Sequence, residues 1–279
     1  MGDSGGWKAS TNDSARATDT TAATVEAMEM TTETVELDGI DIAYRSFTPA
    51  LKADDVPVVL VHGMGGDGGT WDRFARTLTT NGRHAIAVDL RGHGRSAHTP
   101  TYEFESFGGD VLALIDHLGL TEVDIVGHSL GGYAATVVAQ RRPTLVRRLV
   151  VEELPIPIRP GDAPPKLTGK FPSITELWHA GTTVIRHPRA ALAFDRSMTA
   201  PALEQFRKPN AQWWKALSDI AAPTLILRGG PGGMVDPVRL ELMTGAIRDC
   251  RVEVFRSGHS IHRDAYAAFE ATVLPFLTY

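Results

Sequence analysis

The residues most able to do chemistry in this chain lie at 127–132, Gly-His-Ser-Leu-Gly-Gly. The spacing Gly-x-Ser-x-Gly is that of a nucleophile elbow, in which a serine stands on a sharp turn between a strand and a helix. Glycine is required on both sides because larger side chains would collide with the strand and the helix. A β-branched run precedes the motif and a small, apolar, helically spaced run follows it. The pattern therefore predicts Ser129 as a nucleophile for acyl transfer.

Segments with strand and helix patterns alternate along the chain around this motif, after an opening hairpin. Such alternation predicts a parallel, doubly wound sheet, whose ligands bind beyond the carboxyl ends of the strands. The segments that could do chemistry all follow predicted strands and so fall at those ends. The hairpin is predicted at 34–37 and 40–44, the strands at 56–61, 84–88, 123–126, 148–151 and 224–227, and the helices at 70–80 and 104–118.

Four motifs in order along the chain give a resemblance to a known family. His-Gly-Met-Gly-Gly at 62–66 is followed by Asp-Leu-Arg-Gly-His-Gly-Arg-Ser at 89–96, the serine elbow and Gly-His at 258–259. In this order the chain resembles the α/β-hydrolase superfamily, in its serine-nucleophile esterase and lactonase-like branch, over roughly residues 32–279. The resemblance implies an α/β fold with a doubly wound, mostly parallel sheet and an inserted helical cap. Asp89 and Arg91 are expected to brace their loop rather than react.

The resemblance also implies a base and two oxyanion donors. His259 is the predicted base, since the chain order of this fold is serine, acid, histidine. His262 and a structural role for His259 are the alternatives, and His128 is expected to pack beneath the turn. The predicted donors are the backbone N–H groups of Leu130, at the start of a helix, and of Met64.

The acid that orients the base has more than one candidate. In relatives it stands after the strand at 224–227, about four residues before a proline, and in this chain that position is Gly233. Asp236 follows closely, but before Pro237 it is also typical of a helix N-cap. Glu152 ends the strand at 148–151, where haloalkane dehalogenases carry their acid. Glu152 and Asp236 are the leading candidates, with Glu153 third, and a solvated strand end is the alternative for the glutamates.

The chain divides into three predicted parts. Residues 1–30 are rich in small and polar residues and are predicted to be a disordered extension. The catalytic core is predicted at 31–151 and 218–279. The interval 152–217 is too long for an ordinary connection and is predicted to be a helical cap, with helices around 173–187, 189–197 and 200–216. Its aromatic residues face the core or line the pocket, namely Trp178, Phe194, Phe206, Trp213 and Trp214.

Composition excludes several classes of partner. A formal net charge of −5 and the lack of a basic tract argue against nucleic acid. No apolar run reaches the roughly 18 residues of a membrane span. The single cysteine, Cys250, suits a reducing compartment and predicts a cytoplasmic protein. The histidines lack the spacing of a metal-binding helix, and neither a metal nor a cofactor is expected.

These features predict a serine hydrolase that cleaves a small, largely apolar carboxylic ester or lactone. A serine at the elbow argues against a dehalogenase or an epoxide hydrolase, which need a carboxylate there. Hydrolysis of a C–C bond in a diketone and cofactor-free perhydrolysis are the enzymatic alternatives. A ligand receptor that retains the triad is the alternative of another class, and the fold alone does not decide between them.

Overall fold

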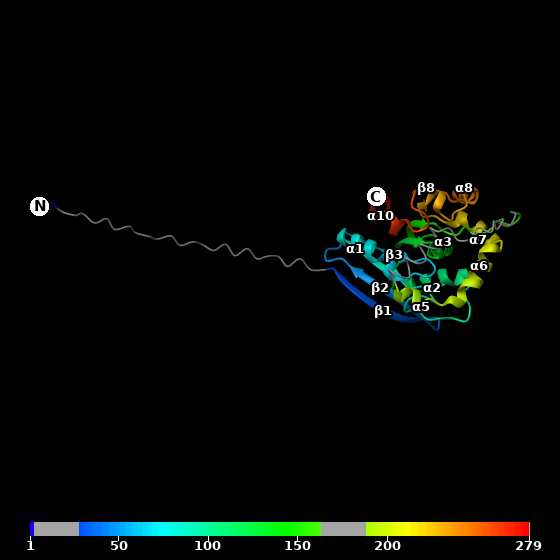
Figure 1. The fold of residues 1–279 in the computed structure, drawn as a ribbon, viewed down its shortest axis with the longest axis horizontal. Helices are drawn as coiled ribbons and strands as arrows, with labels where there is room; N and C mark the ends of the chain where they lie inside the picture. The colour runs from blue at the N-terminus through cyan, green and yellow to red at the C-terminus, as the bar shows by residue number, and fades with distance from the viewer. Residues whose placement is uncertain (3–27, 163–187, 279) are drawn as a thin grey trace.

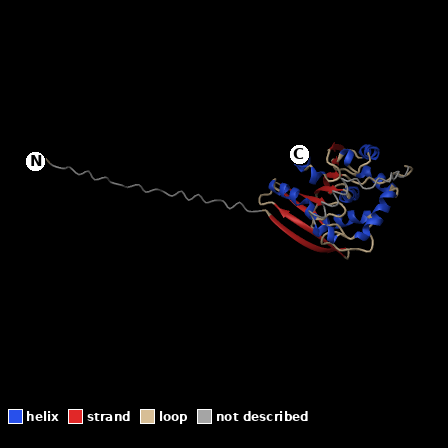
Figure 2. Ribbon diagram, in the orientation of Figure 1, coloured by secondary structure: helices blue, strands red, loops and turns tan. Residues whose placement is uncertain are grey.

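The computed structural model describes residues 1–2, 28–162 and 188–278. Over these residues eight strands form one sheet in the order β1-β2-β4-β3-β5-β6-β7-β8, with helices on both faces (Figures 1 and 2). Most of the predicted N-terminal extension lies outside the described residues. So do the predicted cap helix at 173–187 and Trp178.

The sheet is antiparallel at one edge and parallel elsewhere. β1 and β2 form the predicted hairpin, which turns at Asp38 and Gly39 with φ angles of 51° and 77°. β2 pairs antiparallel with β4, and the other neighbouring strands run parallel. The mostly parallel α/β sheet is therefore confirmed. The strands are β1 Glu29–Leu37, β2 Ile40–Thr48, β3 Asp54–Val61, β4 Arg83–Val88, β5 Val123–His128, β6 Val146–Glu152, β7 Thr224–Arg228 and β8 Cys250–Val254.

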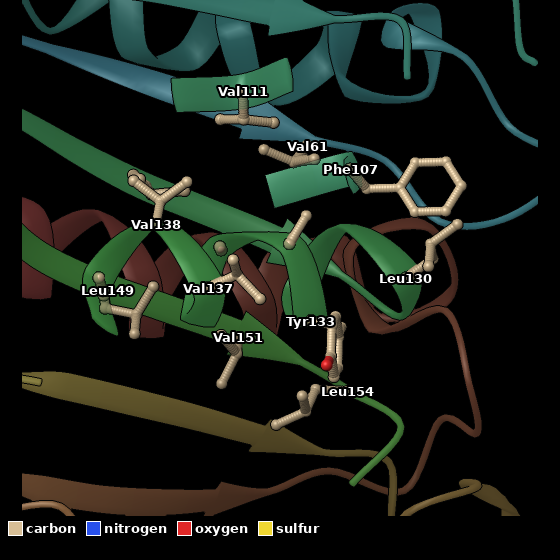
Figure 3. Close-up of a cluster of buried hydrophobic side chains, with 14 of the residues drawn as sticks. Val61, Phe107, Val111, Leu130, Tyr133, Val137, Val138, Leu149, Val151 and Leu154 are labelled. Atoms are coloured by element: carbon tan, nitrogen blue, oxygen red, sulfur yellow. The ribbon is translucent and has the colours of Figure 1, made fainter. Parts of the chain in front are cut away.

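Successive side chains of the buried strands point to opposite faces of the sheet, so each face has its own hydrophobic core. In β3, for example, Val58 and Leu60 pack on one face while Val59 and Val61 pack on the other. The first face is covered by helices α1 (Asp72–Thr80) and α10 (Tyr266–Thr278). The second is covered by α2 (Phe104–His117), α3 (Leu130–Arg141) and α8 (Pro237–Ala246). Figure 3 shows α3 buried in this second core, with Leu130 and Tyr133 in its first turn.

The described part of the cap packs on the second face through an aromatic anchor. Its elements are α5 (Pro188–Ala193), the 3₁₀ helix η2 (Arg196–Met198), α6 (Thr199–Arg207) and α7 (Ala211–Ala216). Trp213 is buried, stacks on Tyr133 of α3, and donates a 3.0 Å hydrogen bond to Thr136 Oγ1. In Figure 1, α6 and α7 lie at the end of the molecule away from α1. No helix in the described segments is long and apolar enough to cross a bilayer.

Candidate active site

Ser129 stands on a strained turn between β5 and α3. Its φ of 51° and ψ of −119° lie in a region that residues other than glycine rarely adopt. A Cβ on Gly127 would collide with the backbone of Gly131, and one on Gly131 would collide with the carbonyl oxygens of Val61 and His62. The backbone geometry is therefore that of the predicted elbow, and its glycines are required by close backbone packing.

A Gly131→Ala variant tests that close packing. The added methyl group would meet backbone oxygens at the end of β3, which cannot move aside as a side chain can. We expect a loss of about 1–3 kcal/mol in the free energy of unfolding, typical of overpacking, together with a lower kcat. Urea unfolding and ester hydrolysis measure the two effects. Gly109→Ala on α2 is the matched control, because a Cβ there meets only Arg141 Nη1, at 3.6 Å. If both variants had equal stability, the packing argument would be wrong.

The loop after β3 lies directly against the serine turn. A Cβ on Gly63 would stand 2.6 Å from His128 Nδ1 and 3.1 Å from Ser129 Cβ. Met64, the next residue, is partly exposed, while Leu130 begins α3. Within the described residues, neither the Met64 nor the Leu130 backbone N–H donates a hydrogen bond. Both N–H groups belong to segments beside the serine turn that the sequence analysis assigned to the oxyanion hole.

Histidine side chains hold this loop from below. The Gly65 N–H donates to His93 Nε2 at 3.0 Å, and His93 Nδ1 donates to the Arg91 carbonyl. His62 Nε2 likewise accepts the Leu90 N–H at 3.0 Å. Asp89 accepts the Gly68 and Arg95 N–H groups, and Arg91 forms a bidentate pair with Asp110. The prediction that Asp89 and Arg91 brace their loop is confirmed.

His93 makes the stability of this loop depend on pH. Burial, followed by the neighbouring His62, lowers the pKa of His93 to about 3. The unfolded chain binds a proton near pH 6.5, whereas the folded protein does not, so stability falls as the pH drops below 6.5. We expect His93 to account for a loss of about 2 kcal/mol in the free energy of unfolding between pH 7.5 and pH 5. Urea unfolding at both pH values measures it.

A His93→Gln variant isolates this contribution, because Gln can accept the Gly65 N–H but does not titrate. Its free energy of unfolding should fall less between pH 7.5 and pH 5 than that of the wild type. His98→Gln is the control, since the His98 side chain is 54% exposed. Equal pH dependence in the wild type and His93→Gln would contradict the prediction.

His259 lies on the loop after β8 and is held at two points. Its Nδ1 donates to Glu153 Oε2 at 3.4 Å, and its backbone carbonyl accepts a 2.8 Å hydrogen bond from His128 Nε2. Since His128 directly precedes Ser129, the structure brings the histidine loop to the serine turn. Within the described residues Ser129 Oγ makes no hydrogen bond, and catalytic hydrogen bonds often tighten only when substrate is bound.

Glu153 is a buried carboxylate directed at the base loop. It follows β6 with a φ of 49° and accepts the backbone N–H groups of Gly229, at 2.6 Å, and Met234. Burial alone would raise the pKa of this carboxyl, but His259 and the two N–H groups bond its charged form. The net result is a pKa below the ordinary value. An ionised carboxylate therefore faces His259 Nδ1.

Gly233 makes the space that this carboxylate occupies. A Cβ at Gly233 would collide with both carboxylate oxygens of Glu153. Gly233 is the position where the family resemblance puts the acid, so the carboxylate of Glu153 fills that place from the neighbouring strand. The sequence carries a signal for this arrangement, namely a glycine at the expected acid position together with acidic residues after β6.

The two leading acid candidates of the sequence analysis contact other groups. Glu152 accepts the backbone N–H and the Nδ1–H of His262, at 3.1 and 2.8 Å, and is fully buried. Asp236 caps α8 by accepting the N–H groups of Val238 and Arg239. The structure brings neither carboxylate to His259. Consecutive side chains at a strand end point to opposite faces, so Glu152 and Glu153 serve different histidines.

One cluster has the residue types of a metal site. One potential ligand atom from each of His128, Glu152 and His262 lies within 4.8 Å of the others. The contacts already made there use these groups differently, since Glu152 pairs with His262 and His128 donates to the His259 carbonyl.

The described cap aromatics fall into two groups. Trp213 is buried against α3, while Trp214 donates to the Pro157 carbonyl at 3.0 Å. Phe206 packs against Phe104, and both line a surface hollow of about 160 Å³. Phe194 lies 5.0 Å from the His93 ring, close to the loop that carries the Met64 amide. Trp213 and Trp214 therefore anchor this segment, while Phe194 contacts the loop of His93 and Phe206 packs on α2.

Comparison with known proteins agrees with this geometry. The family model for the alpha/beta hydrolase fold matches residues 56–178. A solved hydrolase from Pseudomonas aeruginosa superposes with a TM-score of 0.72 at 26% identity, over 89% of this chain and 98% of that one. In sequence and in fold the chain is similar to the α/β hydrolases, and it is an enzyme of that class.

Two curated relatives match most of the chain. The sn-1-specific diacylglycerol lipase of Mus musculus is 28% identical over 79% of this chain and 80% of its own length. The 2-hydroxy-6-oxo-2,4-heptadienoate hydrolase of Pseudomonas putida is 28% identical over 79% of this chain and 88% of its own length. The two names specify different substrates, a diacylglycerol and a 2-hydroxy-6-oxo-2,4-heptadienoate.

Proposed function

We propose that this protein hydrolyses a small, largely apolar carboxylic ester or lactone through an acyl-enzyme intermediate. Ser129 is the nucleophile, His259 the base and Glu153 the acid that orients it. The observation that carries the proposal is the strained Ser129 turn beside a histidine whose Nδ1 faces a buried carboxylate. Nucleophile, base and orienting acid are the three groups of a serine triad.

The first half of the reaction acylates the enzyme. Ser129 Oγ attacks the acyl carbon while His259 Nε2 takes its proton, and the carbonyl oxygen becomes an oxyanion. The Met64 and Leu130 N–H groups stabilise that oxyanion. When the intermediate collapses, the C–O bond to the leaving group breaks and His259 returns the proton to the departing alkoxide. Glu153 holds Nδ1 protonated throughout and stabilises the imidazolium.

Water completes the reaction by the same steps. His259 removes a proton from a water molecule, whose oxygen attacks the acyl carbon of the ester on Ser129. The second tetrahedral intermediate then collapses, the acyl C–O bond to Ser129 breaks, and the serine recovers its proton from His259. A carboxylic acid is released and the enzyme returns to its starting state.

Support for an ester comes from the surroundings of the site and from the mouse lipase. Of the described residues in the predicted cap, Phe194 places its ring 5.0 Å from the His93 ring, beside the loop that carries the Met64 amide. The second candidate is hydrolysis of a C–C bond in a diketone. The Pseudomonas putida relative, named for a 2-hydroxy-6-oxo-2,4-heptadienoate substrate and matched over 88% of its own length, supports a substrate other than a simple ester. Both candidates use the same nucleophile, so the substrate distinguishes them.

A p-nitrophenyl ester series of short to medium acyl length tests the proposal, run beside labelling by a fluorophosphonate. We expect turnover that varies with acyl length, and a label that peptide mapping places on Ser129. Labelling of Ser129 without ester turnover would reject an esterase and favour C–C hydrolysis or a receptor that retains the triad. Absence of both from folded protein would reject the proposed nucleophile.

A further inference from the structure

A second carboxylate–imidazole pair lies beside the first and has no part in the proposed reaction. Glu152 is fully buried, and the His262 side chain is 3% exposed. Glu152 accepts both the Nδ1–H and the backbone N–H of His262. The His262 ring stacks on Trp71 with its centroid 4.2 Å away, and its Nε2 is buried without a hydrogen-bond partner. A buried charged group of this kind needs a physical explanation.

The pair is connected to the serine turn and to the loop after β8 that carries His259. The Ser129 N–H donates to the backbone carbonyl of Glu152 at 2.8 Å. His262 lies on the short helix α9 (Ile261–Asp264), three residues after His259. His128 lies between them, with ring centroids 4.7 Å from His259 and 5.0 Å from His262. Glu152 and Glu153, at the end of β6, thus bind His262 and His259 on the segment after β8.

The hydrogen bonds indicate where the charge of this pair lies. His262 donates through Nδ1, so a second proton on Nε2 would be a buried N–H with no acceptor. Burying a charged N–H without an acceptor costs more free energy than burying a neutral nitrogen without a hydrogen-bond partner. The pair is therefore a carboxylate beside a neutral imidazole and carries a net negative charge.

Few other charged groups among the described residues lie near the loop that carries His259. Among the described residues, the carboxylate that contacts His259 is that of Glu153. Burial lowers the pKa of His128 well below its ordinary value, so His128 is neutral. Arg263 and Asp264 follow on α9, and both have interactions of their own. In the described part of η1 (Gly68–Trp71) and α10, the ring contacts of His262 are with the uncharged side chains of Trp71 and Phe269.

We propose that Glu152 and His262 form a positioning dyad for His259. Its hydrogen bonds fix the loop that carries the base, and its buried negative charge stabilises the imidazolium that forms on His259 during the reaction. Glu152 and His262 touch neither the substrate nor the reacting atoms. The proposal rests on His259 acting as the base of Ser129, which is part of the proposed function.

The test is the pH dependence of serine reactivity in Glu152→Gln and His262→Asn. Gln keeps an acceptor for His262 without the charge, and Asn keeps a donor for Glu152 without a group that titrates. The rate of fluorophosphonate labelling at Ser129 is measured from pH 4.5 to 9, beside kcat/KM for the best ester. Labelling needs the nucleophile and its base but no knowledge of the substrate, so failure of the substrate assignment is separable from failure of this proposal.

We expect the acid limb of the profile to move to lower pH by about one unit in Glu152→Gln, as the loss of a partly screened negative charge near the His259 loop predicts. In His262→Asn the acid limb should stay in place, because the carboxylate remains. Asp236→Asn is the control that removes a distant carboxylate, and it should match the wild type. An unmoved acid limb in Glu152→Gln, or a shift to higher pH in His262→Asn, would overturn the proposal. Unmoved limbs with slower rates would indicate a purely structural pair.

Discussion

A Ser129→Ala variant is expected to lose ester turnover by a factor on the order of 10⁵–10⁶ in kcat, the size of loss known for serine nucleophiles. Alanine removes the attacking oxygen and leaves the rest of the site in place. Because alanine at φ 51° is strained in the same way as serine, the free energy of unfolding should change little. The variant should also resist fluorophosphonate labelling. Stopped assays with high enzyme concentration give the residual rate, and urea unfolding gives the stability.

Ser129→Gly separates the loss of chemistry from the relief of strain. It should be as inactive as Ser129→Ala, but glycine tolerates a positive φ. Its free energy of unfolding should therefore be higher than that of the alanine variant by about 0.5–2 kcal/mol. Turnover above about one per cent in either variant would show that another group performs the attack.

The elbow was predictable from the sequence because its requirements are local. Gly127 and Gly131 have close contacts that only glycine allows. The flanking segments show the hydrophobic periodicity of a strand and of a helix within a few residues. The same holds for the strands at the centre of the sheet, such as β3 and β5, where both faces are buried. Each of these features depends on residues close together in the chain.

The choice of Glu153 over Glu152 and Asp236 as the partner of His259 was not predictable, because it depends on a backbone angle and on packing between distant segments. Glu152 and Glu153 differ by one position, which at a strand end reverses the direction of the side chain. Glu153 has a φ of 49° although it is not glycine, and a glutamate in the sequence does not predict that conformation. The space for its carboxylate is made by Gly233, on a loop that follows another strand.

The roles of the cap aromatics depend on tertiary contacts in the same way. Trp213 and Trp214 are neighbours in sequence, yet the first donates to a side chain of α3 and the second to a backbone carbonyl before the cap helices. Hydrophobic content identified a folded segment but could not separate anchors from residues near the site. The contacts of Trp213 with Tyr133 and of Phe206 with Phe104 become visible only in the three-dimensional structure.

Replacement of Glu153 by Gln should lower kcat by about 10³–10⁴, because the loss of the orienting carboxylate in a serine triad costs up to about 10⁴. Gln is similar in size, but it brings an amide N–H₂ group to a position where the oxygens accept the Gly229 and Met234 N–H groups. Some loss of stability, about 1–3 kcal/mol, should accompany the loss of rate. Asp236→Asn should keep kcat close to the wild-type value, since Asn also caps helices well. A Glu153→Gln variant with near-wild-type kcat would reject Glu153 as the acid.

A paired substitution tests whether Gly233 and Glu153 share one place for the acid. Gly233→Asp alone should impair the enzyme, because its side chain would collide with the Glu153 carboxylate. The backbone at Gly233, with φ −83° and ψ 170°, accepts any side chain. Once Glu153 is shortened to Ala, the aspartate has room to reach His259. We therefore expect Glu153→Ala/Gly233→Asp to exceed Glu153→Ala in kcat by at least about tenfold, a strong departure from additivity. Additive losses would mean that the carboxylate position on β6 cannot be replaced from β7, and that the two sites do not occupy the same space.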